Sequence, residues 1–170
     1  MKKKSANRGS KKSTYIAIVI GIVIIGIATS YFYSIEQAKI KGESFGKQLE
    51  RIQTDLKELQ TKYESDVRVW MEGDITKDEL LEISDMHLQD FEALILRYDE
   101  LEPPKPFMPS VILFKLSTEK QLESDKLLKE WIKTDDDSSR IRSDSLLQES
   151  FEYEMAALSS YNAAKVENQQ

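Results

Sequence analysis

The pattern of hydrophobic and polar positions divides the chain into a short apolar run and a long amphipathic remainder. Residues 13–35 carry no charge, and six lysines and arginines lie directly before them. A helix of about 20 apolar residues, at ~1.5 Å per residue, spans the ~30 Å hydrocarbon core of a bilayer, and a basic flank stays cytoplasmic. The pattern therefore predicts a cytoplasmic tip (1–13), a transmembrane helix (14–35) and an extracytoplasmic remainder (36–170).

A cleaved secretory signal is the alternative interpretation of this run, because Ala28-Thr29-Ser30 imitates the small residues of a cleavage site. The anchor is favoured because the run is long for a signal and because Tyr31-Phe32-Tyr33 follows it, as an interfacial aromatic belt would. Both interpretations place the rest of the chain outside the cytoplasm. The sequence contains no cysteine, which excludes disulfide bonds and a lipid-modified lipoprotein start.

From residue 36 on, apolar side chains recur every three or four positions, which is the spacing of an amphipathic helix. The first stripe consists of Phe45, Leu49, Ile52, Leu56, Leu59, Tyr63, Val67 and Trp70. Its phase extends backwards through Gly42 and Ala38, and no proline interrupts it. We therefore expect a helix over about 36–71 that continues the transmembrane helix as one rod.

A second helix is predicted over about 76–102. Thr76 and Glu79 have the spacing of a capping box, in which each side chain binds a backbone N–H at the helix start. The apolar stripe of this helix is Leu80, Ile83, His87, Phe91, Leu94, Tyr98 and Leu101. All four prolines of the chain lie between 103 and 109, so this segment is predicted to be the linker that ends the helix.

The third and fourth helices are predicted over about 110–133 and 138–166, with acidic and hydroxyl residues at 135–139 suited to the start of the fourth. The apolar residues of the third helix cluster at its two ends, and polar side chains fill the middle of the same face. For the fourth helix we expect a buried stripe of Leu147, Phe151, Met155 and Leu158, widened by Leu146, Tyr153, Ala157, Tyr161 and Ala164.

The helices pair off into two hairpins. Trp70 ends the first helix of one pair and Trp131 ends the first helix of the other, each followed within a few residues by an aspartate. The expected fold is therefore all-α: an antiparallel four-helix bundle of two tandem helical hairpins, whose first helix continues the transmembrane helix.

Charge narrows the possible partners of the exported part. All 30 acidic residues follow residue 35, whereas six of the 24 basic residues precede it, so that residues 36–170 carry a net charge of −12. Nucleic-acid binding wants a basic face, and anionic lipid would repel an acidic one, so neither is expected to contact this part. An acidic surface also serves solubility alone.

Candidate sites are few. His87 is the only histidine, so together with the lack of cysteine it cannot complete the usual metal-ligand sets, and we expect no metal and no cofactor. Glu154 falls inside the apolar arc of the fourth helix, where a buried carboxylate needs a partner. One hypothesis is a polar ligand pocket at mid-height of the bundle, formed by His87, Ser117, Lys120, Gln121, Ser124 and Glu154. The competing interpretation places Glu154 at the wet edge of the arc and His87 in a hydrogen bond to a neighbour.

Small residues share one face of the predicted transmembrane helix. Ala17, Gly21 and Ala28 would permit close packing against another membrane helix, although such residues are also ordinary in membrane spans.

A resemblance adds to this interpretation. Four segments follow a lysine-rich and isoleucine-rich anchor: Phe107, the run Ser-Val-Ile-Leu-Phe-Lys-Leu-Ser at 110–117, Arg142-Ser143-Asp144 and Phe151-Glu152-Tyr153-Glu154. Together with the anchor, these segments resemble uncharacterised single-pass membrane proteins of ammonia-oxidising archaea. The resemblance covers most of residues 66–165. It implies an exported helical bundle and brings no established activity or site residue.

The sequence favours a non-enzymatic function. We expect a single-pass protein of the cell membrane that serves as an interaction, scaffold or accessory subunit, with a protein partner or a second copy bound through the membrane helix and the long first helix. A sensor-like bundle that binds a small ligand in the polar pocket is the alternative. An exported hydrolase is less favoured, because no nucleophile, base and orienting group can be assembled around one histidine.

Overall fold

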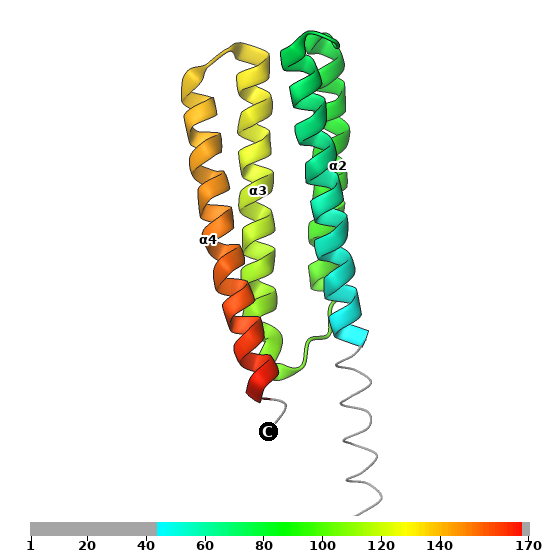
Figure 1. Ribbon diagram of the computed structural model, residues 1–170, viewed down its shortest axis with the longest axis vertical. Helices are drawn as coiled ribbons and strands as arrows, with labels where there is room; N and C mark the ends of the chain where they lie inside the picture. Colours follow the sequence, from blue (N-terminus) through cyan, green and yellow to red (C-terminus); the bar gives the residue numbers. More distant parts are fainter. Residues whose placement is uncertain (1–43, 168–170) are drawn as a thin grey trace, which may run out of the picture. The chain divides into compact units, whose positions relative to one another are not determined.

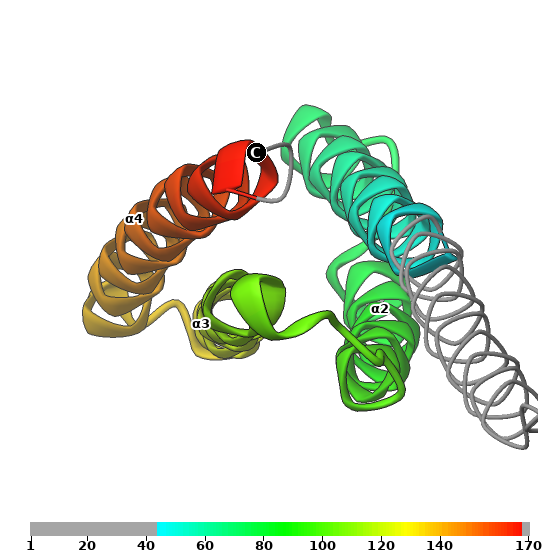
Figure 2. The same ribbon diagram turned by 90° about the horizontal axis from the view of Figure 1, so that it is seen from below.

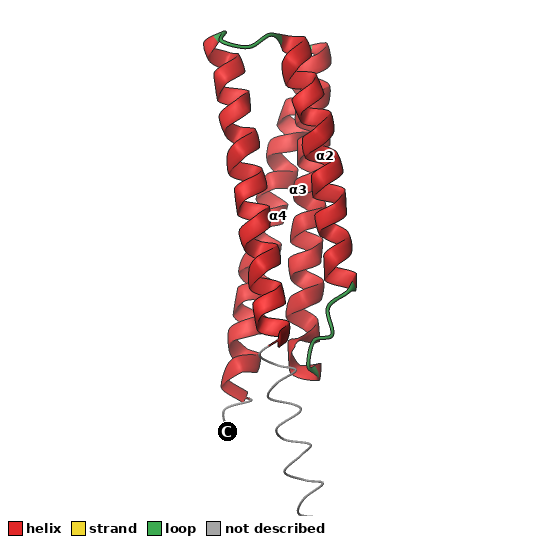
Figure 3. Cartoon of the chain, turned by 90° about the vertical axis from the view of Figure 1, so that its right-hand side faces the viewer, coloured by secondary structure: helices red, strands yellow, loops and turns green. Residues whose placement is uncertain are grey.

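The computed structural model describes residues 44–167, and these form helices joined by short turns. The predicted tip, the transmembrane helix and the start of the long first helix lie outside the described residues. Within them the prediction of an all-helical fold with four long helices is confirmed (Figures 1 and 3). None of the helices in this part of the chain combines the length and the apolar composition that crossing a membrane requires.

The four helices run alternately up and down (Figure 1). The first helix is described from residue 44 to residue 72. It is followed by α2 (Lys77–Asp99), a short 3-10 helix η1 (Lys105–Phe107), α3 (Met108–Thr134) and α4 (Asp137–Glu167). Three turns therefore connect them, two at one end of the bundle and the proline linker at the other.

The proline linker shifts two of the predicted boundaries. α2 ends at Asp99, before the predicted 102, because residues next to the prolines are restricted to extended backbone. α3 begins at Met108, before the predicted 110, with Pro109 inside its first turn, where no backbone N–H is needed.

Side-chain caps fix the starts of two helices. The predicted capping box is confirmed: the Thr76 hydroxyl accepts from the Glu79 N–H at 3.2 Å, and the Glu79 carboxylate accepts from the Thr76 N–H at 2.7 Å. The Thr76 hydroxyl also donates to the Glu79 carboxylate at 2.8 Å, and the two hydrogen bonds that this carboxylate accepts lower the pKa of Glu79. At the start of α4 the Asp136 carboxylate accepts from the Ser138 N–H at 3.1 Å. Asp135, directly before it, adopts a left-handed conformation with a φ of 59° that turns the chain out of α3.

Large apolar side chains from the first three helices fill most of the core. A linker-end cluster comprises Phe45, Leu49, Ile52, Leu94, Tyr98, Val111, Phe114 and Ala157. A middle cluster comprises Phe91, Ile95 and Leu122, and a turn-end cluster comprises Tyr63, Leu80 and Ile132. The predicted apolar stripes of the first two helices supply most of these residues, so those two predictions are confirmed.

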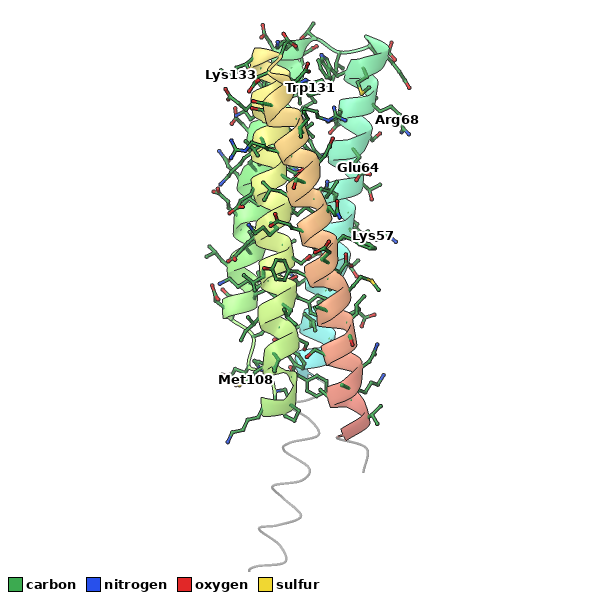
Figure 4. All side chains as sticks on the ribbon, turned by 90° about the vertical axis from the view of Figure 1, so that its left-hand side faces the viewer. Lys57, Glu64, Arg68, Met108, Trp131 and Lys133 are labelled. Atoms are coloured by element: carbon green, nitrogen blue, oxygen red, sulfur yellow. The ribbon has the colours of Figure 1, made fainter. Side chains whose placement is uncertain are left out.

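The turn end is closed by aromatic contacts. Trp70 and Trp131 meet edge to face with their ring centroids 5.8 Å apart. The Arg140 guanidinium lies 4.6 Å from the centroid of Trp131. Trp131 lies near the turns and Met108 at the opposite end of α3 (Figure 4).

α3 and α4 meet through small side chains. Ser117 donates its hydroxyl to the carbonyl of Ser150 at 2.8 Å, and Ser124 donates to the carbonyl of Ser143 at 2.8 Å. Buried small residues continue this contact at seven-residue intervals; we call the set Ser117, Ser124, Ser143, Ser150, Ala157 and Ala164 the small-residue seam. Only side chains of this size let two helix backbones approach until a hydroxyl reaches the other helix's carbonyl.

The predicted central stripe of α4 is therefore wrong, because Leu147, Phe151, Met155 and Leu158 are exposed. The residues predicted to widen it lie closer to the core: Ala157 and Ala164 are buried, and Leu146, Tyr153 and Tyr161 are half-buried. Serines at 143 and 150 take the remaining buried positions of this face. The physical reason is the short separation between α3 and α4, which leaves no room for large side chains at the contact. They are displaced to the neighbouring face of the helix.

Candidate interaction surface and polar core

A buried polar layer joins the first three helices. His87 of α2 lies 2.9 Å from Asp125 of α3, measured from Nε2 to Oδ2, and both side chains are almost fully buried. The imidazole stacks on Tyr63 of the first helix, with the ring centroids 4.0 Å apart and the planes 13° from parallel. His87 is thus held by a neighbour within the core, as the competing interpretation of this residue expected.

Burial shifts the pKa values of two groups in this layer. It raises the pKa of the Asp125 carboxyl, although the hydrogen bond with His87 partly opposes the shift. It also raises the pKa of Tyr63 to about 12. The Tyr63 hydroxyl and the Ser84 hydroxyl share a hydrogen bond of 2.9 Å. Two buried atoms of the layer, Gln60 Oε1 and His87 Nδ1, have no hydrogen-bond partner among the described residues.

A second polar group lies nearer the linker. The Tyr98 hydroxyl accepts from the Gln53 amide at 2.6 Å and shares a hydrogen bond of 3.1 Å with Thr118. Burial raises the pKa of Tyr98 to about 12, and the negative charge of Glu154 adds to the shift. Glu154 of α4 is half-buried and lies close enough to this tyrosine to influence it.

The six residues of the predicted ligand pocket occupy different surroundings. Ser117 and Ser124 lie in the small-residue seam, and Lys120 lies outside the core, where its ammonium is 3.3 Å from Glu123 and 3.4 Å from Glu149. Gln121 is half-buried on α3. Among the described residues, no hydrogen bond joins two members of this set. The pocket stays a prediction, as does the membrane packing of Ala17, Gly21 and Ala28, which lie outside the described residues.

Metal binding has no candidate in the described part. No group of three or more histidine, aspartate or glutamate side chains within residues 44–167 is arranged to hold a metal ion. The Asp125 partner of His87 was not predicted from the sequence, because only the fold shows that this aspartate is buried beside the imidazole.

α4 carries a row of large, exposed apolar side chains, which we call the α4 stripe: Leu147, Phe151, Met155 and Leu158. Their exposed fractions are 44%, 62%, 53% and 41%. The spacing of four, four and three residues places them along one side of the helix. Sequence analysis identified these residues but assigned them to the core.

The packing of α4 leaves this stripe uncovered. α4 lies beside α3, and its N-terminal part stands apart from the first helix (Figures 1 and 2). Of the three core clusters, only the one at the linker end includes residues of α4, namely Ala157 and the partly buried Tyr161. Within residues 44–167, large side chains therefore join α4 to the core only at the linker end.

Comparison of the chain with protein-family models, with curated proteins and with solved structures gives no match.

Proposed function

We propose that this protein is a single-pass membrane protein whose extracytoplasmic helical bundle acts non-enzymatically as an interaction, scaffold or accessory subunit. The observation that carries the proposal is the exposed α4 stripe. Contiguous apolar rows on a folded surface mark places where another molecule binds. The stripe is not a packing defect, because the small-residue seam holds α4 to α3 by buried hydrogen bonds on the adjacent face.

Membrane anchoring is supported by the sequence of residues 1–35, with its uncharged run behind a basic tip. Only eight residues separate the end of that run at residue 35 from the first described residue of the bundle at 44, so the bundle would stand close to the membrane. A partner bound at the stripe would then be another protein at the same membrane surface.

The sensor alternative has less support. A pocket in the middle of α3 would use Ser117 and Ser124, but their hydroxyls already bond α4 in the seam. A ligand there would have to break those bonds and separate the two helices.

The topology can be tested by cysteine labelling, because the chain has no cysteine of its own. We expect Ser138→Cys at the exposed start of α4 to react with a membrane-impermeant maleimide on intact cells, and Ser5→Cys in the predicted tip to react only after lysis. Equal labelling of both before lysis, or of neither, would contradict the anchor.

The interaction can be tested by site-specific photo-crosslinking in membranes. A photoreactive residue in place of Phe151 is expected to give a discrete adduct, whereas one in place of Lys62, which is exposed on the first helix, is expected to give none. Absence of a discrete adduct from Phe151 and from Leu147 would overturn the proposed function.

A further inference from the structure

We propose that the α4 stripe binds an amphipathic α-helix of a partner protein whose apolar face is flanked by lysine and arginine. This inference rests on the proposed function and adds the chemistry of the partner. It follows from the shape of the stripe and from the charges beside it.

The stripe has the dimensions of a helix-docking surface. Leu147, Phe151 and Leu158 follow the i, i+4 and i+11 positions of one helix face, so they present a straight apolar row about 16 Å long at ~1.5 Å per residue. A partner helix with apolar anchors at i, i+4 and i+7 would lie along this row. The N-terminal part of α4 stands apart from the first helix (Figure 2), and the side chains of the row are 41–62% exposed, so an added helix can reach them.

Carboxylates border the row on both sides. Around the helix axis, Glu154 lies about 60° from Phe151 in one direction and Glu152 lies about 100° from it in the other. Among residues 44–167 neither carboxylate is in a salt bridge, although Glu152 accepts a 3.4 Å hydrogen bond from Gln148. A partner helix with basic residues beside its apolar anchors would pair with both.

Charge also decides against a second copy as the occupant. Residues 36–170 carry a net charge of −12, so two copies would bring like charges together. Parallel copies anchored in one membrane would set Glu154 opposite Glu154 at the edge of the row. Like charges held close across an interface oppose association, whereas opposite charges steer it.

The test compares two designed helical peptides that share one leucine row and differ only in their flanks, lysine in one and glutamate in the other. The full-length chain is incorporated in neutral phosphatidylcholine nanodiscs, and binding is measured by fluorescence anisotropy at low and at high salt, with empty nanodiscs subtracted. We expect the lysine peptide to bind at least about tenfold more tightly than the glutamate peptide, and the difference to shrink with salt.

Two pairs of variants locate the binding site. Phe151→Ser is expected to weaken binding of the lysine peptide about tenfold, whereas Ile141→Ser, which removes an exposed apolar side chain elsewhere on α4, leaves it unchanged. The double variant E152Q/E154Q is expected to weaken binding about threefold and to flatten its salt dependence. The matched control E58Q/E72Q removes the same charge from exposed positions of the first helix and is expected to have no such effect.

Three results would overturn this inference: no binding of the lysine peptide, binding that Phe151→Ser leaves unchanged, or equal binding of both peptides. Efficient disulfide formation between copies of a Phe151→Cys variant in membranes would identify a second copy as the occupant instead. A Phe151 photo-adduct with a partner that lacks a basic helix would refute the partner chemistry while leaving the proposed function standing.

Discussion

The two hairpins of the bundle are held together by different means. The first helix and α2 interlock through large side chains such as Leu80 and Phe91, which are completely buried. α3 and α4 instead meet through the small-residue seam, in which serine hydroxyls reach the carbonyls of the facing helix. The comparison shows that the separation between two helices, more than the hydrophobicity of a residue, decides which side chains are buried.

The difference has a consequence for the surface. The α3–α4 contact buries small residues, so that the large apolar residues of the α4 stripe stay exposed. To these exposed residues we assign binding. The predictions below test this contrast, beginning with the largest expected effect.

Two phenylalanines provide the sharpest test. Phe91 is 0% exposed in the middle cluster, and Phe151 is 62% exposed in the α4 stripe. Phe91→Ala is expected to lower the free energy of unfolding by about 3–5 kcal/mol, and Phe151→Ala to change it by less than about 0.5 kcal/mol. Urea denaturation followed by circular dichroism would measure both. Similar losses would mean that the stripe is part of the core after all.

The buried pair between α2 and α3 comes next. Asp125→Ala is expected to cost about 3 kcal/mol, because it leaves His87 Nε2 without its partner in the core. Asp125→Asn keeps a polar group in place and should cost less. A loss of less than about 0.5 kcal/mol for Asp125→Ala would show that the pair contributes nothing to folding.

The same pair predicts a pH dependence. Because the pKa of Asp125 is raised in the folded state, folding favours its protonated form. The protonated Asp125 carboxyl therefore contributes to the free energy of unfolding below its ordinary pKa of about 3.8. This contribution is lost as pH rises through the raised pKa of the folded state. Unfolding free energies measured from pH 3 to pH 7 should therefore fall for the natural chain relative to Asp125→Asn. A constant difference over this range would contradict the direction of the shift.

The seam can be broken by adding volume. Ala157 is fully buried, and its neighbour Ala156 is exposed on the same helix. Ala157→Leu is expected to cost about 1–3 kcal/mol, because α3 and α4 must separate to admit it, whereas Ala156→Leu should change stability by less than about 0.5 kcal/mol. Thermal denaturation would measure the pair. Equal stability of the two variants would show that the seam is looser than described.

The cap of α2 is expected to have the smallest effect. Thr76→Ala should cost about 1 kcal/mol, since it removes the hydroxyl that accepts from the Glu79 N–H. The hydrogen bonds from Thr76 lower the pKa of Glu79. The ionised Glu79 carboxylate therefore stabilises the fold above the ordinary pKa of 4.5, and this stabilisation is lost as pH falls through the lowered pKa. The cost of Thr76→Ala should accordingly diminish in acid. Amide hydrogen exchange in the first turn of α2 would follow the same loss locally.

Much of the fold could be predicted from the sequence because its signals are local. The stripe from Phe45 to Trp70 has helical spacing, and Thr76 and Glu79 form a cap with residues only three apart, so no knowledge of distant neighbours was needed. The four prolines likewise restrict their own backbone.

The buried face of α4 could not be predicted by the same means. Ranking residues by hydrophobicity selects Phe151 over Ser150, but the distance to α3 reverses that order. The signal that could have revealed it is the seven-residue interval shared by Ser117 and Ser124 on one helix and by Ser143 and Ser150 on the other. In the candidate site, His87 was found because it is the only histidine, whereas Asp125 was one aspartate among many until the fold placed it beside the imidazole.

The edge-to-face contact of Trp70 with Trp131 gives the molecule a built-in optical reporter. These are the only two tryptophans of the chain, and both lie at the turn end of the bundle. Intrinsic fluorescence therefore registers opening of that end and does not report on the linker end. A protein that frays from its turn end would lose its tryptophan signal before its helical circular dichroism, and one that unfolds from its linker end would lose them in the opposite order.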